Sequence, residues 1–157
     1  SAVESEYSLL TRDVEKEILP LTKELGVTLV PFSPLGRGLV TNTINVNALG
    51  ENDFRKHLPR YNGIYWENNQ KLTAEFAEIA ESKGITPAQL ALAWILAQSE
   101  NIIPIPGTKR IKYLEENAKA TDVNLLPDDI SKIELLLKKY PNIGNRYNEY
   151  DFKFVNK

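Results

Sequence analysis

At the start of the chain, hydrophobic positions switch between the two-residue period of a strand and the longer period of a helix. The first ten residues, SAVESEYSLL, have a β-prone composition. Apolar residues then recur at helical spacing over residues 14–25, and Gly26 follows as a stop signal. The segment VTLVPFS, residues 27–33, is apolar on both alternations, which is typical of a parallel strand covered on both faces. The pattern therefore predicts strand, helix and strand in this order.

The middle of the chain combines a long irregular segment with two helical patterns. Residues 34–66 show neither period and are rich in Gly, Asn and Pro. Because a compact domain seldom carries so long a loop without a function, we predict a functional loop here. An amphipathic helix is predicted over residues 67–83, with Gly84 at its end. A second helix is predicted to begin with a capping box formed by Thr86 and Gln89.

The last third of the chain contains one strand pattern and two further helical patterns. IIPIP, residues 102–106, is predicted to be a short buried strand. The helix that follows is expected to turn Ile111, Leu114 and Ala118 inward. Residues 127–140 have Pro and Asp at their start and Lys at their end, which complements a helix dipole. The polar-aromatic tail after them is expected to be irregular or docked.

Strands that alternate with helices imply a parallel α/β sheet. Only three strands are predicted, whereas a closed (β/α)₈ barrel needs eight strands and about 250 residues. Three strands could form an open sheet, but they fit better as the last part of a barrel. The predicted fold is therefore α/β, the C-terminal portion of a (β/α)₈ TIM barrel, with about three βα units and a C-terminal helix. The sequence contains no methionine, so we expect it to begin within a longer protein.

Composition narrows the classes of function. A net charge of −2 gives no general attraction to nucleic acid or anionic membranes, so neither is an expected partner. The absence of cysteine excludes disulfides and thiolate catalysis and is compatible with a cytoplasmic protein. The only histidine, His57, is expected to be a loop residue, and a lone histidine without cysteine argues against a metal site.

Five segments occur in an order and at intervals that resemble the aldo-keto reductases: SEYSLLTRD, VPFSPLGRGLVT, LPRYN…ENN, GITPAQLALAWILAQ and IPIPGTKRIKYLEEN. The chain is most similar to the plant and microbial branch often described as auxin-induced or perakine-reductase-like. The resemblance runs from residue 2 to about residue 140 and corresponds to the last three βα units of that family's barrel. It implies an oxidoreductase that passes a hydride from NADPH to an aldehyde or ketone, with NADPH/NADP⁺ lying across the barrel mouth.

The segment PGTKR combines features of a phosphate site. Gly107 is expected to allow a tight turn, Thr108 offers a hydroxyl and a candidate helix cap, and exposed amides of a helix start attract an anion. Phosphate sites at this place are common in (β/α)₈ barrels. The resemblance implies a pocket for the 2′-phosphate of NADPH, with Glu116 and Asn117 on the adenine. Lys109 and Arg110 would add positive charge to this pocket. The alternative is that these two residues belong to an ordinary solvated helix start.

FSPLGRG follows the second predicted strand and has the composition of a loop that approaches a ligand. Gly36 and Gly38 would let the main chain come close, and Arg37 could grip a pyrophosphate. A Gly-rich connector is the alternative. The resemblance implies that the cofactor is lined by Ser33, Pro34 and Leu35 and stacked by Phe32, which replaces the tyrosine of many members.

Glu4 departs from the pattern of the family. The family usually has glutamine at the position of Glu4, and a carboxylate can accept but not donate a hydrogen bond to the nicotinamide carboxamide. We therefore expect altered positioning of the nicotinamide and a relative preference for the oxidised cofactor.

Tyr61, Tyr65 and Trp66 could shape a substrate pocket or could anchor the loop by packing, and both alternatives stay open.

The family's catalytic tyrosine, lysine, aspartate and histidine belong to the first half of its barrel, so no catalytic residue is expected in this chain. The chain alone is then expected to be inactive, with a small carbonyl substrate and the missing N-terminal half barrel as partners. Uncovered strand edges would also favour self-association. Two alternatives are a non-catalytic nucleotide-binding module, as in some potassium-channel β-subunits, and a truncated pseudoenzyme that dimerises.

These expectations divide the chain into one partial barrel domain over residues 1–157. Its parts are two strands with an intervening helix (1–33), a long cofactor and substrate loop (34–66), helices with the last strand and the phosphate-binding helix (67–121), and a C-terminal helix with its tail (122–157).

Overall fold

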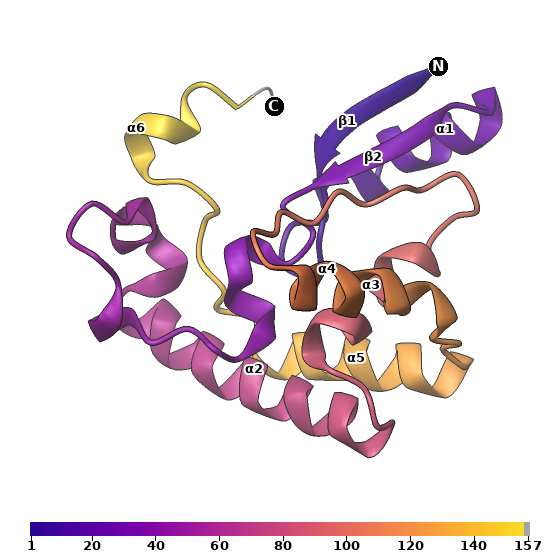
Figure 1. The fold of residues 1–157 in the computed structure, drawn as a ribbon. Coiled ribbons are helices and arrows are strands. Elements are labelled where there is room, and N and C mark those ends of the chain that lie inside the picture. The colour runs from indigo at the N-terminus through magenta and orange to yellow at the C-terminus, as the bar shows by residue number, and fades with distance from the viewer. Residues whose placement is uncertain (156–157) are drawn as a thin grey trace.

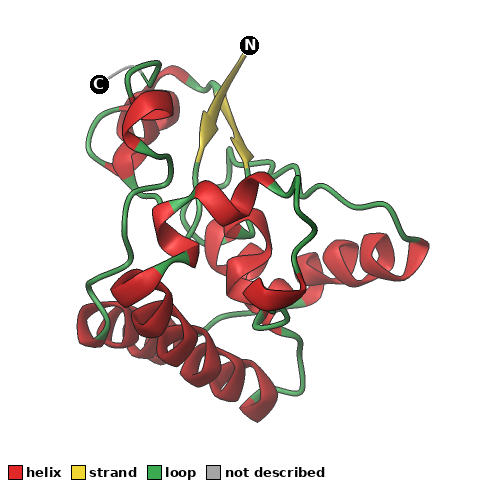
Figure 2. Cartoon of the chain, turned by 90° about the vertical axis from the view of Figure 1, so that its left-hand side faces the viewer, coloured by secondary structure: helices red, strands yellow, loops and turns green. Residues whose placement is uncertain are grey.

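The short apolar runs and the capped helical patterns form separate layers in the computed structural model, which describes residues 1–155. The strands lie at one side of the molecule and most of the helices gather below them, whereas the short last helix stands apart at the end of the tail (Figures 1 and 2). The elements are β1 (Ala2–Glu6), α1 (Ile18–Leu25), β2 (Thr28–Phe32), α2 (Gly63–Ser82), α3 (Pro87–Leu96), α4 (Ile111–Ala118), α5 (Pro127–Lys139) and α6 (Glu149–Phe152).

The predicted parallel arrangement of strands is confirmed. β1 pairs with β2 in parallel, and residues 101–105 run along the other edge of β2. The amide of Leu29 donates to the carbonyl of Asn101 at 2.8 Å, and the amide of Ile103 donates back to Leu29 at 3.0 Å. The ladder stays incomplete beyond this bridge because Pro31 has no N–H to donate. The predicted strand at 102–106 is therefore an extended segment with a single bridge.

Burial of this sheet is one-sided, which corrects two predictions. Leu29 is fully buried against the helices, and Ile102 beside it is buried as well. On the opposite face, Ile103 is 60 % exposed and Ile105 is 46 % exposed. The prediction of a strand covered on both faces is therefore wrong for β2, and the prediction of a buried IIPIP strand is wrong on this face, because no element within residues 1–155 covers it.

Helix α2 begins earlier than predicted. Its N-cap is Asn62, whose carbonyl accepts a hydrogen bond from the amide of Trp66 at 3.1 Å. Tyr65 and Trp66 therefore lie in the first turns of α2, and the irregular segment ends at residue 62. The sequence hid this start because Ile64 is 64 % exposed and gives no inward periodicity.

Helices α3 and α5 match their predictions. In α3, the Thr86 hydroxyl accepts from the amide of Gln89 at 3.2 Å, and the Gln89 side chain accepts from the amide of Thr86 at 3.0 Å. α3 is buried on almost every side, and α5 packs Ile133 and Leu136 into the same core. The capping box and the terminal charges thus identified real helix ends.

Helix α4 does not pack as predicted. Ile111 is 76 % exposed and Leu114 is 59 % exposed, and α4 contains no buried residue. Polar contacts attach the helix instead: the Thr86 hydroxyl donates to a Glu116 carboxylate oxygen at 2.8 Å, and the Gln89 amide donates to the Glu116 carbonyl at 3.1 Å. The expectation that Ile111, Leu114 and Ala118 point inward is wrong, since no element within residues 1–155 covers that side of α4.

The tail after α5, predicted to be irregular or docked, is docked at its start; its last two residues, 156–157, lie outside the described residues. Asn68 donates to the carbonyl of Tyr140 at 3.2 Å, and the buried Asn69 donates to the carbonyl of Ile143 at 3.0 Å.

Every helix within residues 1–155 is too short or too polar to span a bilayer.

Candidate cofactor-binding site

The candidate site lies where the carboxyl ends of the parallel segments meet. β1 leads into the turn at residues 7–12, β2 into residues 33–41, and the third segment into residues 107–110. In parallel α/β folds, ligands bind outside the carboxyl ends of the strands. The topology therefore brings the FSPLGRG and PGTKR segments, far apart in the sequence, to one edge of the sheet.

The loop after β2 carries unusual backbone geometry. Ser33 and Arg37 have φ angles of +50° and +57°, and Gly36 and Gly38 between and after them have +55° and +91°. A non-glycine residue in this region costs of order 1–3 kcal/mol and is concentrated at functional sites. A Cβ added at Gly36 would lie 3.2 Å from Leu10, so the loop also needs this glycine for packing. The strain supports the prediction of a functional loop.

The guanidinium group of Arg37 is engaged by the protein itself. Its Nη1 donates to the carbonyl of Arg146 at 2.8 Å, and its Nη2 lies 3.5 Å from Oε2 of Glu6. The group also lies over the rings of Tyr147, at 4.6 Å, and Phe54, at 5.6 Å. Its side chain is only 12 % exposed, so the predicted grip on a pyrophosphate requires a rearrangement.

Tyr61 anchors the loop after β2 by hydrogen bonds to its backbone. It is buried, and its hydroxyl donates to the carbonyls of Gly36 at 3.0 Å and Arg37 at 3.3 Å. Burial raises the pKa of Tyr61 to about 12, despite the nearby arginines. Its ring stacks on Trp66 with centroids 6.1 Å apart. For Tyr61 and Trp66, these contacts favour the anchoring alternative over direct contact with a substrate.

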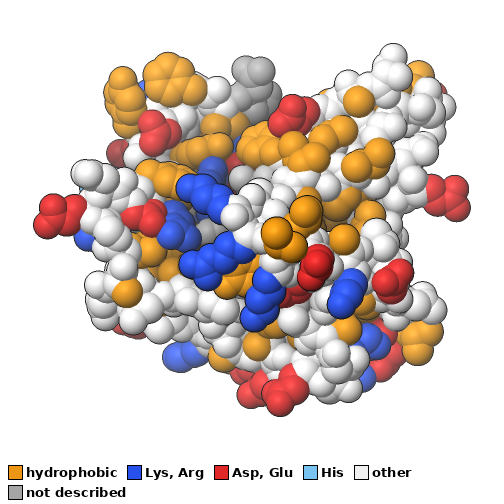
Figure 3. Space-filling model, viewed as in Figure 1, with side chains coloured by type: hydrophobic (Ala, Val, Ile, Leu, Met, Phe, Trp, Pro, Cys, Tyr) orange, Lys and Arg blue, Asp and Glu red, His pale blue; other side chains and the backbone are white. Residues whose placement is uncertain are grey.

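The start of α4 presents free positive charge. Lys109 and Arg110 are exposed and form no ion pair within residues 1–155. The N-cap is Arg110, without a side-chain cap, so the N–H groups of Ile111 and Lys112 are available to an anion, whereas the amide of Tyr113 donates to the Arg110 carbonyl at 3.0 Å. Lys and Arg side chains gather on this face of the molecule beside an exposed apolar area (Figure 3).

Two details of the PGTKR prediction need correction. Thr108 does not cap α4; its hydroxyl accepts from the amide of Arg110 at 3.4 Å and donates to the carbonyl of the same residue. Gly107 is not in the left-handed region, so no tight turn requires glycine there. A Cβ at Gly107 would meet nothing within 4 Å, and the space beside it is open.

The residues predicted to contact the nicotinamide and the adenine lie in two places. Glu4 pairs with Val30 in the sheet register, which places Glu4 and the half-buried Phe32 on one sheet face, two residues apart along the strands. Glu116 and Asn117 lie on the last turn of α4, where the Glu116 carboxylate accepts from Thr86. Within residues 1–155, no hydrogen bond joins Glu4 or Phe32 to Glu116 or Asn117.

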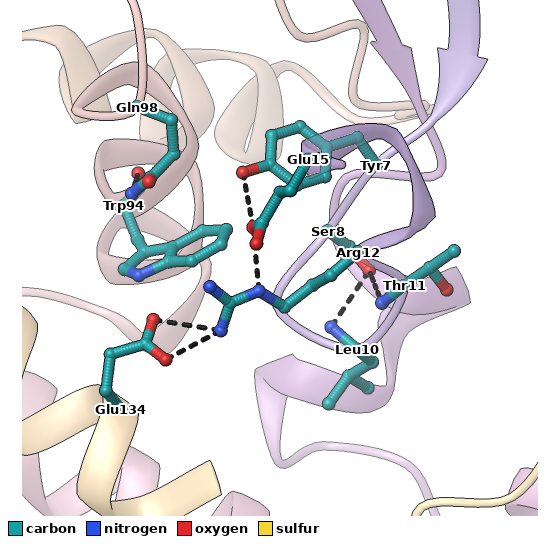
Figure 4. Close-up of polar contacts among 9 residues, drawn as sticks. All are labelled: Tyr7, Ser8, Leu10, Thr11, Arg12, Glu15, Trp94, Gln98 and Glu134. Carbon is teal, nitrogen blue, oxygen red and sulfur yellow. Dashed lines mark hydrogen bonds and ion pairs between the residues drawn. The ribbon is translucent and has the colours of Figure 1, made fainter. Parts of the chain in front are cut away.

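A polar tie stabilises the turn after β1 (Figure 4). The Tyr7 hydroxyl and the Nε of Arg12 donate to the same Glu15 oxygen at 2.8 and 2.7 Å. Nη1 of Arg12 donates to both carboxylate oxygens of Glu134 on α5, and its guanidinium lies 4.9 Å from the Trp94 ring. Burial and the bond to Glu15 raise the pKa of Tyr7 above its usual value, so Tyr7 stays a neutral donor.

Sequence reasoning missed a cluster at the edge of the site. Glu6 is buried, its Oε1 accepts from the Thr11 hydroxyl at 3.1 Å, and its Oε2 faces Arg37 and Arg146. Arg60 is buried nearby, and burial lowers its pKa to about 10. Neither alternation nor spacing indicated these residues, because their partners come from distant segments. Within residues 1–155, no group of three acidic, histidine or cysteine side chains could hold a metal.

A sequence model of the aldo/keto reductase family matches residues 1–138. The chain is 39 % identical over 160 residues to "Probable aldo-keto reductase 1" of Glycine max, a match that covers 99 % of this chain and 46 % of that protein. The chain thus spans about half the length of this relative.

Solved structures agree. The fold matches the glycerol dehydrogenase AKR11B4 of Gluconobacter oxydans with a TM-score of 0.82 at 21 % identity, over 88 % of this chain and 42 % of that one. It also matches the thermostable aldo-keto reductase Tm1743, solved with the inhibitor epalrestat, with a TM-score of 0.58 at 29 % identity, over 86 % and 39 %. The chain belongs to the aldo/keto reductase family, a family of oxidoreductases, and its α/β fold is part of that family's (β/α)₈ barrel.

Proposed function

We propose that the protein containing this chain reduces aldehydes and ketones with NADPH, and that this chain supplies much of the cofactor-binding half. The observation that carries the proposal is the free cationic start of α4, where Lys109 and Arg110 stand beside uncapped helix amides and open space at Gly107. This combination suits the phosphate that distinguishes NADPH from NADH.

The remaining residues fit a dinucleotide laid along the edge of the sheet. Lys109 and Arg110 would hold the 2′-phosphate, and the strained loop at residues 33–38 would approach the pyrophosphate. Phe32 would lie against the nicotinamide ring. When bound, the cofactor supplies a hydride to the substrate carbonyl carbon. The proton donor would come from the other half of the barrel, so activity requires that half as well as a small carbonyl substrate.

Replacing both Lys109 and Arg110 by alanine should weaken binding of 2′,5′-ADP by about ten- to thirtyfold, because each charged donor contributes to the phosphate contact. Isothermal titration of the full-length protein measures this. Lys119→Ala is the matched control, since it removes an exposed charge from the residue immediately after α4. Unchanged affinity in the double variant, or an equal loss in the control, would contradict the proposed phosphate site.

Glu4→Gln should shift the balance between the two cofactor forms. A carboxylate near the nicotinamide favours the form whose ring is positively charged, so its removal should reduce the preference for NADP⁺ over NADPH about two- to fivefold. The ratio of the two dissociation constants, from fluorescence titration, reports this shift. Glu100→Gln, at an exposed turn, is the control. If Glu4→Gln leaves both affinities unchanged, the predicted role of Glu4 is wrong.

A further inference from the structure

The tail between α5 and α6 crosses the edge of the candidate site along a fixed path. We call residues 143–147 the tail clasp. Asn69 donates to the carbonyl of Ile143 at 3.0 Å, and Nε of Arg60 donates to the carbonyl of Gly144 at 3.1 Å. Gly144 has a φ of +83°, and a Cβ there would lie 2.8 Å from the Tyr65 ring. The start of the clasp is therefore held by one hydrogen bond from α2, by a second from Arg60, and by close packing on the Tyr65 ring of α2.

The other end of the clasp engages the guanidinium of Arg37 through one hydrogen bond and a ring contact. The Arg146 carbonyl accepts from Nη1 of Arg37, and the Tyr147 ring covers one face of the guanidinium while Phe54 lies near it as well. A bidentate grip on a phosphate needs two neighbouring N–H groups that are open to the ligand. With a side chain only 12 % exposed, Arg37 cannot present such a fork while the clasp is in place.

The contacts beneath the clasp are imperfect. Oε2 of Glu6 and Nε of Arg146 are both buried and have no hydrogen-bond partner within residues 1–155, although they lie 3.9 Å apart. The other ion pair of Arg146 is with Asp13, whose side chain is 78 % exposed. Buried polar groups without good partners cost free energy, so this arrangement can be displaced by a ligand that satisfies the arginines better.

We propose that the tail clasp competes with a pyrophosphate group for Arg37. In the clasped state Arg37 binds the tail, and a pyrophosphate takes its place by displacing Tyr147 and the Arg146 carbonyl. The inference rests on the proposed function in one respect, namely that the loop at residues 33–38 faces the pyrophosphate of the cofactor. The clasp lies beyond residues 1–138, the part that the family model matches.

The test is Tyr147→Ala in the full-length protein, titrated with inorganic pyrophosphate. Removing the ring should strengthen binding roughly three- to tenfold, because the free state loses its cation–π contact with Arg37. Tyr147→Phe keeps the ring and should bind like the wild type. Tyr150→Ala is the matched control, since Tyr150 lies on the same tail, is 69 % exposed and, among the aromatic rings of the described residues, has only an edge-to-face contact with Phe154. In the wild type, added pyrophosphate should increase hydrogen exchange of the clasp amides.

Three outcomes overturn the clasp: unchanged affinity in Tyr147→Ala, weaker affinity, or no pyrophosphate binding by any variant. Thermal unfolding of each variant shows whether it is folded. Parallel titration with 2′,5′-ADP, which has the 2′-phosphate but no pyrophosphate, separates the two proposals. Loss of 2′,5′-ADP binding with an intact Tyr147 effect removes the NADPH proposal alone, and the reverse removes the clasp alone.

Discussion

Trp94→Ala should lower the free energy of unfolding by about 3–5 kcal/mol, the largest effect expected for a single residue of this chain. The indole is fully buried at the centre of the core, tilted against the Tyr7 ring with centroids 5.8 Å apart. Truncation would leave a cavity between α3 and the turn after β1, and it would remove the surface on which Arg12 lies. Urea unfolding followed by circular dichroism measures the loss without relying on the deleted fluorophore.

Two variants sharpen this test. Trp94→Phe keeps a ring in the core and loses no hydrogen bond, because the indole N–H has no partner within the described residues. It should cost only about 1–2 kcal/mol. Trp66→Ala truncates the other tryptophan, which is half-buried and stacks on Tyr61, and its cost should also stay well below that of Trp94→Ala. Equal losses for the two alanine variants would show that Trp94 is not the centre of the core.

The helix ends that could be predicted are those with local chemistry. The capping box at Thr86 and Gln89 and the proline at the start of α5 act within one turn of their own helix, so they can be identified without knowledge of the fold. The start of α2 at Gly63 has no side-chain cap, and the hydrophobic pattern predicts this start too late in the sequence. Local signals therefore predicted element identity better than they predicted boundaries.

Burial could not be predicted where it depends on elements outside the chain. Ile111 and Leu114 have helical spacing, and Ile103 and Ile105 have the alternation of a strand, yet all four are exposed. Periodicity reports which side of an element is apolar, and it cannot report whether another element covers that side. A chain that spans about half of its relative leaves such faces open.

The residues of the candidate site could also be predicted only where they are neighbours in the sequence. The cations at the start of α4 are neighbours in sequence, and their exposure followed from the helix start alone. The engagement of Arg37 by Arg146 joins residues 109 positions apart, from a loop to an irregular tail, and no periodicity connects them. Glu6 was missed for the same reason. Partners from distant segments become visible only when the fold brings them together.

The tie at Arg12 is the second place where a single change should have a large effect. Arg12 links two carboxylates from different elements, Glu15 before α1 and Glu134 on α5. All three side chains are about two-thirds buried, with exposed fractions of 32 %, 27 % and 32 %. Burial alone would lower the pKa of Arg12, but its hydrogen bonds to the two carboxylates raise the pKa above its usual value. The guanidinium is therefore held as a cation between two anions.

Arg12→Ala should destabilise the protein by about 2–3 kcal/mol, because Glu15 and Glu134 would remain partly buried without their shared cation. Arg12→Lys should not restore stability, since an ammonium group cannot bind both carboxylates and also stack on Trp94. A double-mutant cycle with Glu134→Ala should give a coupling energy of about 1 kcal/mol or more. Lys132→Ala, which breaks the exposed pair with Asp128 on the same helix, should cost less than about 0.5 kcal/mol. If Arg12→Ala costs no more than Lys132→Ala, the tie does not hold α5 against the turn that follows β1.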